Sequence, residues 1–570
     1  MTRVTLPNSV RSLGAHAFES CGRLIQLTLP ESLESIGSGA FTYCSLLQSL
    51  HIPASVTSIG EGVCRNCNSL ASVDVASGNT VYDSRDNCNA VLVTATDSIV
   101  ITCKNTVIPS TVTRICDYAF YNNEQLTSMD IPETVLSIGK YAFCGCSNLT
   151  GIEIPDATAS IGEYAFGNCW QLASVKLPKS LKIIERNTFA YDEALTGIVI
   201  PDSVTEIREW AFAGCHSLAQ LQLSQSLKSI GDYAFSGCSN IKRLEIPAAV
   251  TSIKRNSFTG CSSLDTIIVD QGNQVYDSRN NSNAIIETES NTLMMGCNSS
   301  TVPDGVKAIG DSAFYQCYTL PAVVMPNTVE RIGDNSFASC NALESVDMGT
   351  SVKSIGAEAF YSCSNLKSVK IPNAVDTINR YTFGFCSNLE RLELNPSLKL
   401  IGGYAFYRCS SLKSVIIPDS VNRISYDAFA YCNAMTSVTI GKSVNTIDSY
   451  AFNSTPLAHV VCLATTPPSL SSSSFSSQAY SNATLQVPLE SLEAYQQHNY
   501  WKKFTRIVPF IGAGPGDIDG DGEINIADAT RLIDKLLSGE ELPAYIDVNG
   551  DGSVDIADVT SILDSMLGGN

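Results

Sequence analysis

The sequence predicts an α/β protein built as a long solenoid, followed by a small all-α domain of two loop–helix units. Two observations predict this fold. First, a phenylalanine returns every 23 residues along most of the 570-residue chain, which defines about 17 units. Second, the chain closes on two similar acidic segments, DIDGDGEINIAD and DVNGDGSVDIAD, which start 30 residues apart. A repeat of this length indicates stacked units rather than one compact core.

The repeated phenylalanine marks one position in each unit, and Cys64 occupies that position in the third unit. The other positions are Phe18, Phe41, Phe120, Phe143, Phe166, Phe189, Phe212, Phe235, Phe258, Phe314, Phe337, Phe360, Phe383, Phe406, Phe429 and Phe452. We assign residues 1–462 to the solenoid.

A representative unit is IPDSVTEIREWAFAGCHSLAQLQ, residues 200–222. Its LAQLQL segment, residues 218–223, has apolar residues at strand spacing. Proline follows in most units and ends the strand, because it has no N–H to donate. SVTEI predicts a second short strand, and EWAFAGC predicts a helical turn that buries its Ala and Phe. Each coil can bury its apolar side only against the next coil, so the strands stack along the array.

Two units are longer than the rest, because the step to the next phenylalanine is 56 residues after both Cys64 and Phe258. The two inserts, near residues 74–105 and 268–300, match one another. Each predicts an Asn/Asp-rich turn followed by two strands. We interpret them as oversized coils. The alternative is that their polar loops, YDSRDN and YDSRNN, are contact sites.

The two ends of the array differ. Residues 463–510 predict a capping region, with a strand and a helix over the last coil. The residues that would cover this coil are Leu492, Tyr495, Trp501 and Phe504. Residues 511–516 indicate a linker, and residues 517–570 form a separate domain. Met1 falls inside a unit, so we expect further residues upstream of this sequence, including a signal peptide.

The cysteines follow the repeat. Of the 21 cysteines, 14 stand three residues after the phenylalanine position. One cysteine per coil predicts a ladder of small buried thiols, because free Cys packs as a small hydrophobe. Some disulfides are the weaker alternative, and a metal site is the least favoured. Cys103 and Cys297, at matching insert positions, could be exceptions. The ladder comprises Cys21, Cys44, Cys67, Cys146, Cys169, Cys215, Cys238, Cys261, Cys317, Cys340, Cys363, Cys386, Cys409 and Cys432.

Charge and composition exclude several classes of function. The net charge is −20, and residues 511–570 hold 13 acidic and 2 basic residues, which leaves −9 for the rest. No basic patch indicates a nucleic-acid partner. No apolar run is long enough for a transmembrane segment. The five histidines share no repeat position, and no catalytic or nucleotide-binding motif stands in a fitting context, so we expect no enzyme activity.

The first strand of each coil presents a mixed polar face that suits protein or glycan contacts. A plain solvated face is an equally good interpretation for any single residue. The central outward positions are Thr28, His51, Asp74, Asp130, Glu153, Lys176, Val199, Gln222, Glu245, Ile268, Val324, Asp347, Lys370, Glu393, Ile416 and Thr439.

The acidic segments predict two calcium sites. Each has carboxylate or amide side chains at loop positions 1, 3, 5, 9 and 12, with glycine at position 6. Calcium takes six to eight oxygen ligands, and this spacing supplies them. An amphipathic segment follows each loop and predicts a helix. The first set of ligands is Asp517, Asp519, Asp521, the backbone oxygen of Glu523, Asn525 through water, and Asp528. The second set is Asp547, Asn549, Asp551, the backbone oxygen of Ser553, Asp555 through water, and Asp558.

Both parts resemble known families. The unit IP.SV..IG..AF.GC.SL is similar to BspA-like leucine-rich repeats of bacterial surface proteins, over roughly residues 1–510. This resemblance implies a right-handed leucine-rich-repeat solenoid on a secreted or surface protein, with a role in adhesion to host matrix proteins or cells. The loop–helix pair resembles a type I dockerin, over about residues 516–569. This second resemblance implies a calcium-dependent domain that docks into a cohesin or another envelope protein.

The tail departs from cellulosomal dockerins at the positions that recognise the partner. Those dockerins commonly carry a Ser-Thr pair just before the closing Asp, where this chain has Ile526-Ala527 and Ile556-Ala557. Calcium binding does not depend on these positions, but the identity of the partner does.

Two functions follow from the sequence. The first is a non-catalytic surface adhesion protein whose solenoid binds protein or glycan ligands and whose tail anchors it. The alternative is an accessory subunit of an extracellular polysaccharide-degrading, cellulosome-like complex, recruited through a cohesin. Retention of binding by the solenoid alone would favour the first, and a cohesin-like partner would favour the second.

Overall fold

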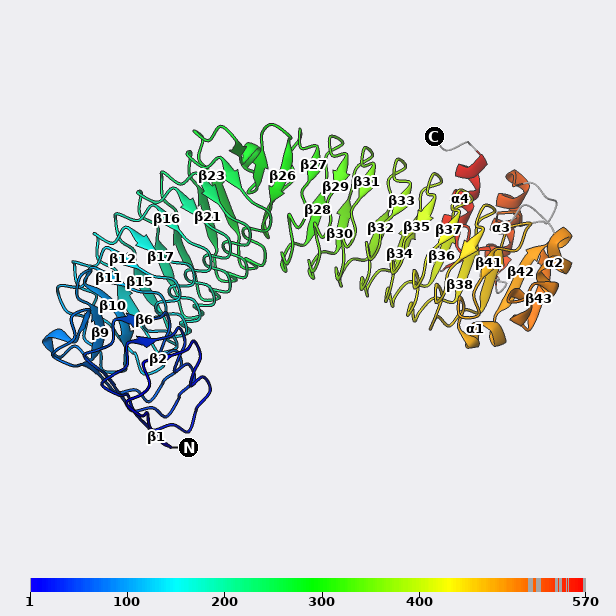
Figure 1. Cartoon of the computed structure of the whole chain (residues 1–570). Helices are drawn as coiled ribbons and strands as arrows, with labels where there is room; N and C mark the ends of the chain where they lie inside the picture. The colour runs from blue at the N-terminus through cyan, green and yellow to red at the C-terminus, as the bar shows by residue number, and fades with distance from the viewer. Residues whose placement is uncertain are drawn as a thin grey trace. The chain divides into compact units, whose positions relative to one another are not determined.

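The computed structural model describes residues 2–510, 516–518, 524–538, 542, 546–549, 551 and 553–566. The chain divides into two units, Met1–Asp277 and Ser278–Asn570. Within each unit, short strands from successive coils lie side by side (Figure 1). Strands pair in parallel with a register of 23 residues, as Ile152 with Val175 and Ile207 with Ile230 show. The predicted solenoid of stacked parallel strands is therefore confirmed.

In the first unit, two strands per coil form two sets of sheets. The first set is β1 (Arg3–Thr5), β3 (Gln26–Thr28), β5 (Ser49–Ile52), β7 (Ser72–Val75), β13 (Gly151–Glu153), β15 (Ser174–Lys176), β17 (Gly197–Val199), β19 (Gln220–Gln222), β21 (Arg243–Ile246) and β23 (Thr266–Val269). The second set is β2 (Ser12–Leu13), β4 (Ser35–Ile36), β6 (Ser58–Ile59), β11 (Arg114–Ile115), β12 (Ser137–Ile138), β14 (Ser160–Ile161), β16 (Ile183–Ile184), β18 (Glu206–Ile207), β20 (Ser229–Ile230) and β22 (Ser252–Ile253).

The second unit repeats this arrangement. Its first set is β28 (Ala322–Val324), β30 (Ser345–Asp347), β32 (Ser368–Lys370), β34 (Arg391–Glu393), β36 (Ser414–Ile417), β38 (Ser437–Ile440) and β40 (His459–Cys462). Its second set is β27 (Ala308–Ile309), β29 (Arg331–Ile332), β31 (Ser354–Ile355), β33 (Thr377–Ile378), β35 (Leu400–Ile401), β37 (Arg423–Ile424), β39 (Thr446–Ile447) and β41 (Ser469–Leu470).

Each insert contains a short 3-10 turn and two longer strands, as predicted. In the first, β9 (Ala90–Val93) and β10 (Ser98–Thr102) pair antiparallel after β8 (Tyr82–Asp83) and η1 (Arg85–Asn87). In the second, β25 (Ile285–Glu287) and β26 (Thr292–Met295) pair in the same way after β24 (Tyr276–Asp277) and η2 (Arg279–Asn281).

The polar loop of the first insert uses its side chains internally. Arg85 binds Asp83 at 2.6 Å and Asp97 at 2.7 Å. The side-chain oxygen of Asn79 accepts hydrogen bonds from the backbone of Val81 and Tyr82. These contacts fold the loop back on its own coil, which favours the oversized coil over the contact site.

Stacked phenylalanine rings form the axis of the core. Phe120 and Phe143 have ring centroids 4.7 Å apart, and Phe166 and Phe189 have centroids 5.6 Å apart, with nearly parallel planes. In the second unit the ladder continues past the last predicted unit, because Phe475 stacks on Phe452 at 5.1 Å. Each ring covers the face of the next, so no coil can bury its phenylalanine without a neighbour.

The third side of each coil differs from the predicted helical turn. In the representative coil, Trp210 has a φ of 60°, a left-handed conformation that interrupts a helix. The backbone N–H of Phe212 donates to Ala234 O in the next coil, at 2.8 Å. The turn therefore bonds to its neighbour rather than to itself, and only its burial of Ala211 and Phe212 agrees with the prediction.

The cysteine ladder is buried as predicted, except for Cys21 in the first coil, and all 21 cysteines are free thiols. The structure adds a reason for cysteine at this position. The thiol donates to the carbonyl oxygen of the phenylalanine 26 residues earlier, as Cys215 does to Phe189 at 3.1 Å. The same bond is made by Cys44, Cys67, Cys146, Cys169, Cys238, Cys261, Cys340, Cys363, Cys386, Cys409 and Cys432. Cys103 and Cys297 are also buried and donate to the carbonyl oxygens of Asn89 and Asn283.

The capping region covers the last coil with α1 (Ser477–Asn482), β42 (Thr484–Pro488), η3 (Leu489–Ser491), α2 (Leu492–Gln497), η4 (Trp501–Lys503) and β43 (Arg506–Phe510). Tyr495, Trp501 and Phe504 are buried and Leu492 packs against the same core, as predicted. The Tyr495 hydroxyl donates to Ala464 O at 2.7 Å, and the Trp501 ring N–H donates to Pro468 O at 2.8 Å. These bonds satisfy the polar atoms of the two largest buried side chains.

Asp192 stands in the cysteine ladder, three residues after Phe189, and its side chain is fully buried. One carboxyl oxygen accepts a hydrogen bond from the Cys169 backbone, and the other has no partner. Desolvation raises the pKa of this carboxyl well above its usual value. The folded chain therefore holds the proton to higher pH than the unfolded chain does, and Asp192 costs stability as pH rises above about 4.

We predict that Asp192→Asn leaves stability nearly unchanged at pH 4 and raises it at pH 8. The reason is that Asn keeps the shape of the protonated side chain without a charge, and removing a poorly satisfied buried charge is worth on the order of 1–3 kcal/mol. Urea unfolding of both proteins at the two pH values measures the difference. An equal difference at pH 4 and pH 8 would contradict an ionisation at Asp192.

Candidate functional sites: the acidic loops and the strand face

The acidic tail contains the two predicted helices, α3 (Ile526–Ser538) and α4 (Ile556–Met566). They pack through a small core of Ala529, Leu532, Ile546, Val559 and Ile562. Each helix follows one acidic segment directly. Of the predicted calcium ligands, Asp519, Asp521 and Glu523 lie outside the described residues, and the other nine lie within them.

The closing aspartates of the two segments have matching geometry. Asp528 and Asp558 lie in the first turns of α3 and α4, and both are fully buried. One oxygen of each accepts a backbone N–H at 2.6 Å, from Ile518 and Val548 respectively. The other oxygen accepts the N–H of the residue three before it, at 2.8 Å in both cases. Each aspartate therefore ties the start of its loop to its helix.

The rest of the second loop also turns its oxygens inward. Asn549 and Asp547 both accept the backbone N–H of Asp551, at 2.8 and 3.1 Å. Asp551 accepts the N–H of Ser553 at 2.9 Å. At loop position 9, Asn525 and Asp555 each accept the N–H of the residue two further on, at 2.8 Å. The two loops thus share one hydrogen-bonded framework.

The donor set fits calcium. The side chains at the ligand positions offer only carboxylate, amide and hydroxyl oxygens, which are hard donors. Two of the carboxylates are withdrawn from solvent, a costly arrangement that a bound divalent cation would offset. Among the described residues, no three acidic, histidine or cysteine side chains converge closely enough to form a metal site by themselves.

The tail exposes apolar side chains at the start of both helices. Ile526 and Ile556 occupy the same place in the two repeats, and their side chains are 60% and 65% exposed. Leu537, further along α3, is 81% exposed. Large apolar side chains at duplicated exposed positions are typical of a protein contact surface.

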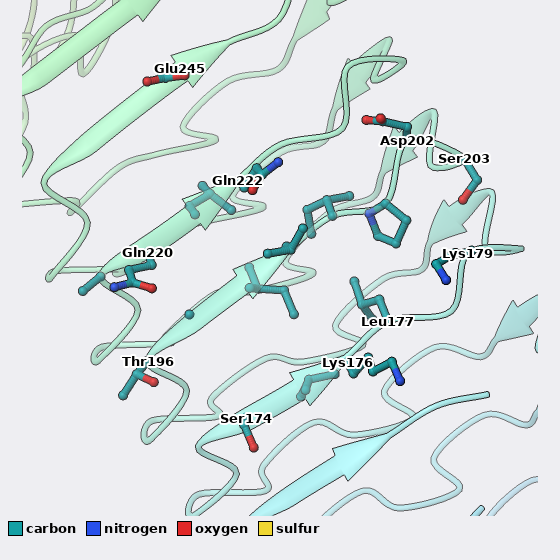
Figure 2. Close-up of a pocket in the computed structure, with 18 of the residues that line it drawn as sticks. Ser174, Lys176, Leu177, Lys179, Thr196, Asp202, Ser203, Gln220, Gln222 and Glu245 are labelled. Atoms are coloured by element: carbon teal, nitrogen blue, oxygen red, sulfur yellow. The ribbon is translucent and has the colours of Figure 1, made fainter. Parts of the chain in front are cut away.

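The strand face of the first unit contains a hollow of about 1080 Å³ across β15, β17, β19 and β21. Figure 2 shows Ser174, Lys176, Gln220 and Gln222 projecting from neighbouring strands around it. Its floor includes Gly197, which has no side chain, and Val199, which is 59% exposed. The hollow therefore exists because two successive outward positions of one coil carry small side chains between longer ones.

The charges around the hollow are paired. Lys176 binds Glu153 at 3.1 Å, and Lys179 binds Asp156 at 2.7 Å, each one coil away. None of the described residues that line the hollow is aromatic. Its surface is thus apolar at the floor, polar through hydroxyl and amide groups, and electrically balanced.

The other predicted outward positions are exposed, with two differences in the second unit. Ile416 is half-buried and Thr439 is buried. His51 and Asp74, on β5 and β7, lie 2.6 Å apart with both side chains exposed. The open arrangement of this pair is that of a surface contact.

The comparisons with known proteins agree with both parts. The family model described as "BspA type Leucine rich repeat region" matches in several copies, over residues 1–90, 100–192, 182–290, 290–410 and 353–485. The chain therefore belongs to the BspA-type leucine-rich-repeat family. The model of the dockerin type I domain matches residues 515–567, so the tail is a dockerin domain. Both are binding modules of extracellular or cell-surface proteins.

Solved structures show the same fold. A leucine-rich cell surface protein from Faecalibacterium prausnitzii is 27% identical, with a TM-score of 0.51, over 63% of this chain and 93% of that chain. A leucine-rich repeat protein from Bacteroides ovatus is 26% identical, with a TM-score of 0.38, over 73% of this chain and 87% of that chain. One from Eubacterium ventriosum is 21% identical, with a TM-score of 0.49, over 66% and 93%. A comparison with curated proteins found no match.

Within the described ranges, no helix combines the length and the apolar character that crossing a membrane requires.

We predict that the full chain binds two calcium ions and that each closing aspartate is needed for one of them. Asp528→Ala should remove one ion and the double variant with Asp558→Ala should remove both, because each change deletes the ligand that joins loop to helix. Isothermal titration measures the number of ions. Asp534→Asn, an exposed change on α3, is the control and should keep both. Two ions bound by the double variant would show that the loops are not the sites.

Proposed function

We propose that this chain is a non-catalytic secreted or cell-surface binding protein of a bacterium. Its solenoid binds a ligand through the strand face of the first unit, and its dockerin domain anchors it in a calcium-dependent way. The hollow across β15 to β21 is the observation that carries this proposal, because it is a shaped, partly apolar surface in a protein built only of binding modules.

The chemistry of the hollow favours a protein ligand over a glycan. Sugar rings are commonly held against aromatic faces, and the described lining has none. An apolar floor with amides and hydroxyls around it suits an apolar side chain with its neighbouring peptide groups. The paired charges leave no net charge to select an anionic ligand.

The dockerin domain supports the second half of the proposal. Calcium would hold the two loops folded and so present α3 and α4 as one surface. Ile526 and Ile556 stand where cellulosomal dockerins commonly carry polar pairs, so the partner would offer an apolar surface. The partner is a cohesin-like domain or another protein of the cell envelope.

An accessory subunit of a polysaccharide-degrading complex is the second candidate. The dockerin domain favours it, since such domains join subunits to a scaffold. The two candidates share the docking step and differ in what the solenoid binds.

We predict that Val199→Arg weakens ligand binding by about tenfold, or about 1.4 kcal/mol. A long cation on the floor of the hollow would displace the apolar contact and bury an unpaired charge. Binding of the full chain to a panel of immobilised extracellular-matrix proteins measures the loss.

The matched control for this variant is Val324→Arg. Val324 is also a central outward valine, on β28, and its side chain is 67% exposed, but it lies outside the hollow. This control should bind as the unchanged protein does. Equal losses in both variants would mean that the hollow is not the ligand site.

We also predict that Ile526→Asp combined with Ile556→Asp abolishes docking and leaves calcium binding intact. Both side chains are exposed and neither is a predicted ligand, so the change should act on the partner surface alone. Capture of envelope proteins by the full chain, with calcium or with a chelator, measures docking, and titration measures calcium. Unchanged calcium-dependent capture would place the docking surface elsewhere.

A further inference from the structure

The third coil is the one place in the predicted array where the ladder carries a thiol instead of a phenyl ring. Cys64 replaces the phenylalanine, and Cys67, three residues on, is the ladder cysteine of the same coil. The sequence between them is Arg65-Asn66, so the two cysteines form a Cys-x-x-Cys pair. Every other coil that keeps the ladder cysteine has a ring at the first of these positions.

The backbone brings the two residues together. The N–H of Cys67 donates to Cys64 O at 3.3 Å, and Asn66 has a φ of 58°, so the four residues form a closed turn. The first and last residues of such a turn have Cα atoms less than about 7 Å apart. This separation lies near the range that a disulfide spans, about 4.4–6.8 Å.

The side chains meet as well. The Cys64 thiol is hydrogen-bonded to the Cys67 side chain. Both residues line a small cavity of about 20 Å³, with Cys103, Thr102 and Asn122 on its other sides. A space of this size holds about one water molecule. Cys64 is half-buried, so this pair has contact with a polar space that the fully buried ladder thiols lack.

The geometry points to a disulfide-forming dithiol at Cys64 and Cys67, which we propose reacts with low-molecular-weight disulfides. One cysteine thiolate attacks a sulfur of R–S–S–R, forms a mixed disulfide and releases one thiolate, which takes up a proton. The second cysteine thiolate attacks the protein sulfur of the mixed disulfide and displaces the other thiolate. The net reaction converts two cysteine thiols and one R–S–S–R into one protein disulfide and two R–SH.

The environment of the pair sets its rate. The hydrogen bond to Cys67 and burial raise the pKa of the Cys64 thiol well above its usual value. Little thiolate is present at neutral pH, so exchange is slow there and quickens by up to about tenfold per pH unit. An extracellular location supplies the oxidising conditions under which such a disulfide persists.

The ladder thiols provide an internal control. Cys215 and Cys238 come from successive coils, and the two side chains are also hydrogen-bonded. Both are fully buried, and each thiol donates to a phenylalanine carbonyl. They belong to no closed turn and line no described cavity, so they should stay reduced while the chain is folded.

The test uses the folded full chain with oxidised glutathione at pH 7 and pH 9, followed by denaturation and alkylation of the remaining thiols. We expect the loss of two alkylated thiols per chain, faster at pH 9, and their recovery with a reductant. Trypsin cleaves after Arg65, so a Cys64–Cys67 disulfide would join the peptides 24–65 and 66–85. Fragmentation separates Cys64 from Cys44, which lies on the same peptide.

Cys64→Ser and Cys67→Ser should each prevent the loss of the thiol pair. Cys64→Phe, which restores the ladder residue, is a second variant of the same site and should behave alike. A joined peptide pair or two lost thiols in any of these variants would overturn the proposal. So would oxidation of Cys215 and Cys238 at the same rate, or full retention of all thiols at pH 9.

Discussion

The 23-residue register is the constraint on which the rest of the structure depends. It places each phenylalanine over the one before, as Phe337 over Phe360 with centroids 5.1 Å apart. It also sets each ladder thiol against the carbonyl of the preceding phenylalanine, as Cys386 against Phe360 O at 3.2 Å. A coil one residue longer would break both contacts, so extra residues enter as whole inserts. The same register spaces the outward side chains and so forms the face on which a ligand can bind.

Function follows from departures from this register. Gly197 and Val199 leave a hollow because they are small where neighbouring coils carry Gln220, Gln222 and Lys176. Asp192 introduces a buried carboxyl and Cys64 a second thiol where the ladder is otherwise regular. The dockerin domain lies outside the register altogether, and its loops depend on hydrogen bonds that end on Asp528 and Asp558.

The sequence was most informative where residues repeat. The phenylalanine and cysteine ladders, the capping aromatics and the paired closing aspartates could be predicted, because each pattern is compatible with few folds. The left-handed residue at Trp210 could not, since an aromatic side chain gives no sign of a positive φ, and the expected helical turn was wrong. The thiol–carbonyl bond needs the distance between coils. The hollow depends on side-chain lengths in four adjacent coils, which the outward positions taken one by one do not convey.

Hydrogen exchange of the full chain, with and without calcium, tests most directly the claim that two independently stabilised parts make up this protein. The account predicts that calcium slows exchange in α3 and α4 and leaves the strands of the coils unchanged, because the coils are held by their own ladders. Equal protection of α3 and α4 without calcium would contradict the dependence of the tail on the ion. A calcium-dependent change throughout the coils would contradict their independence.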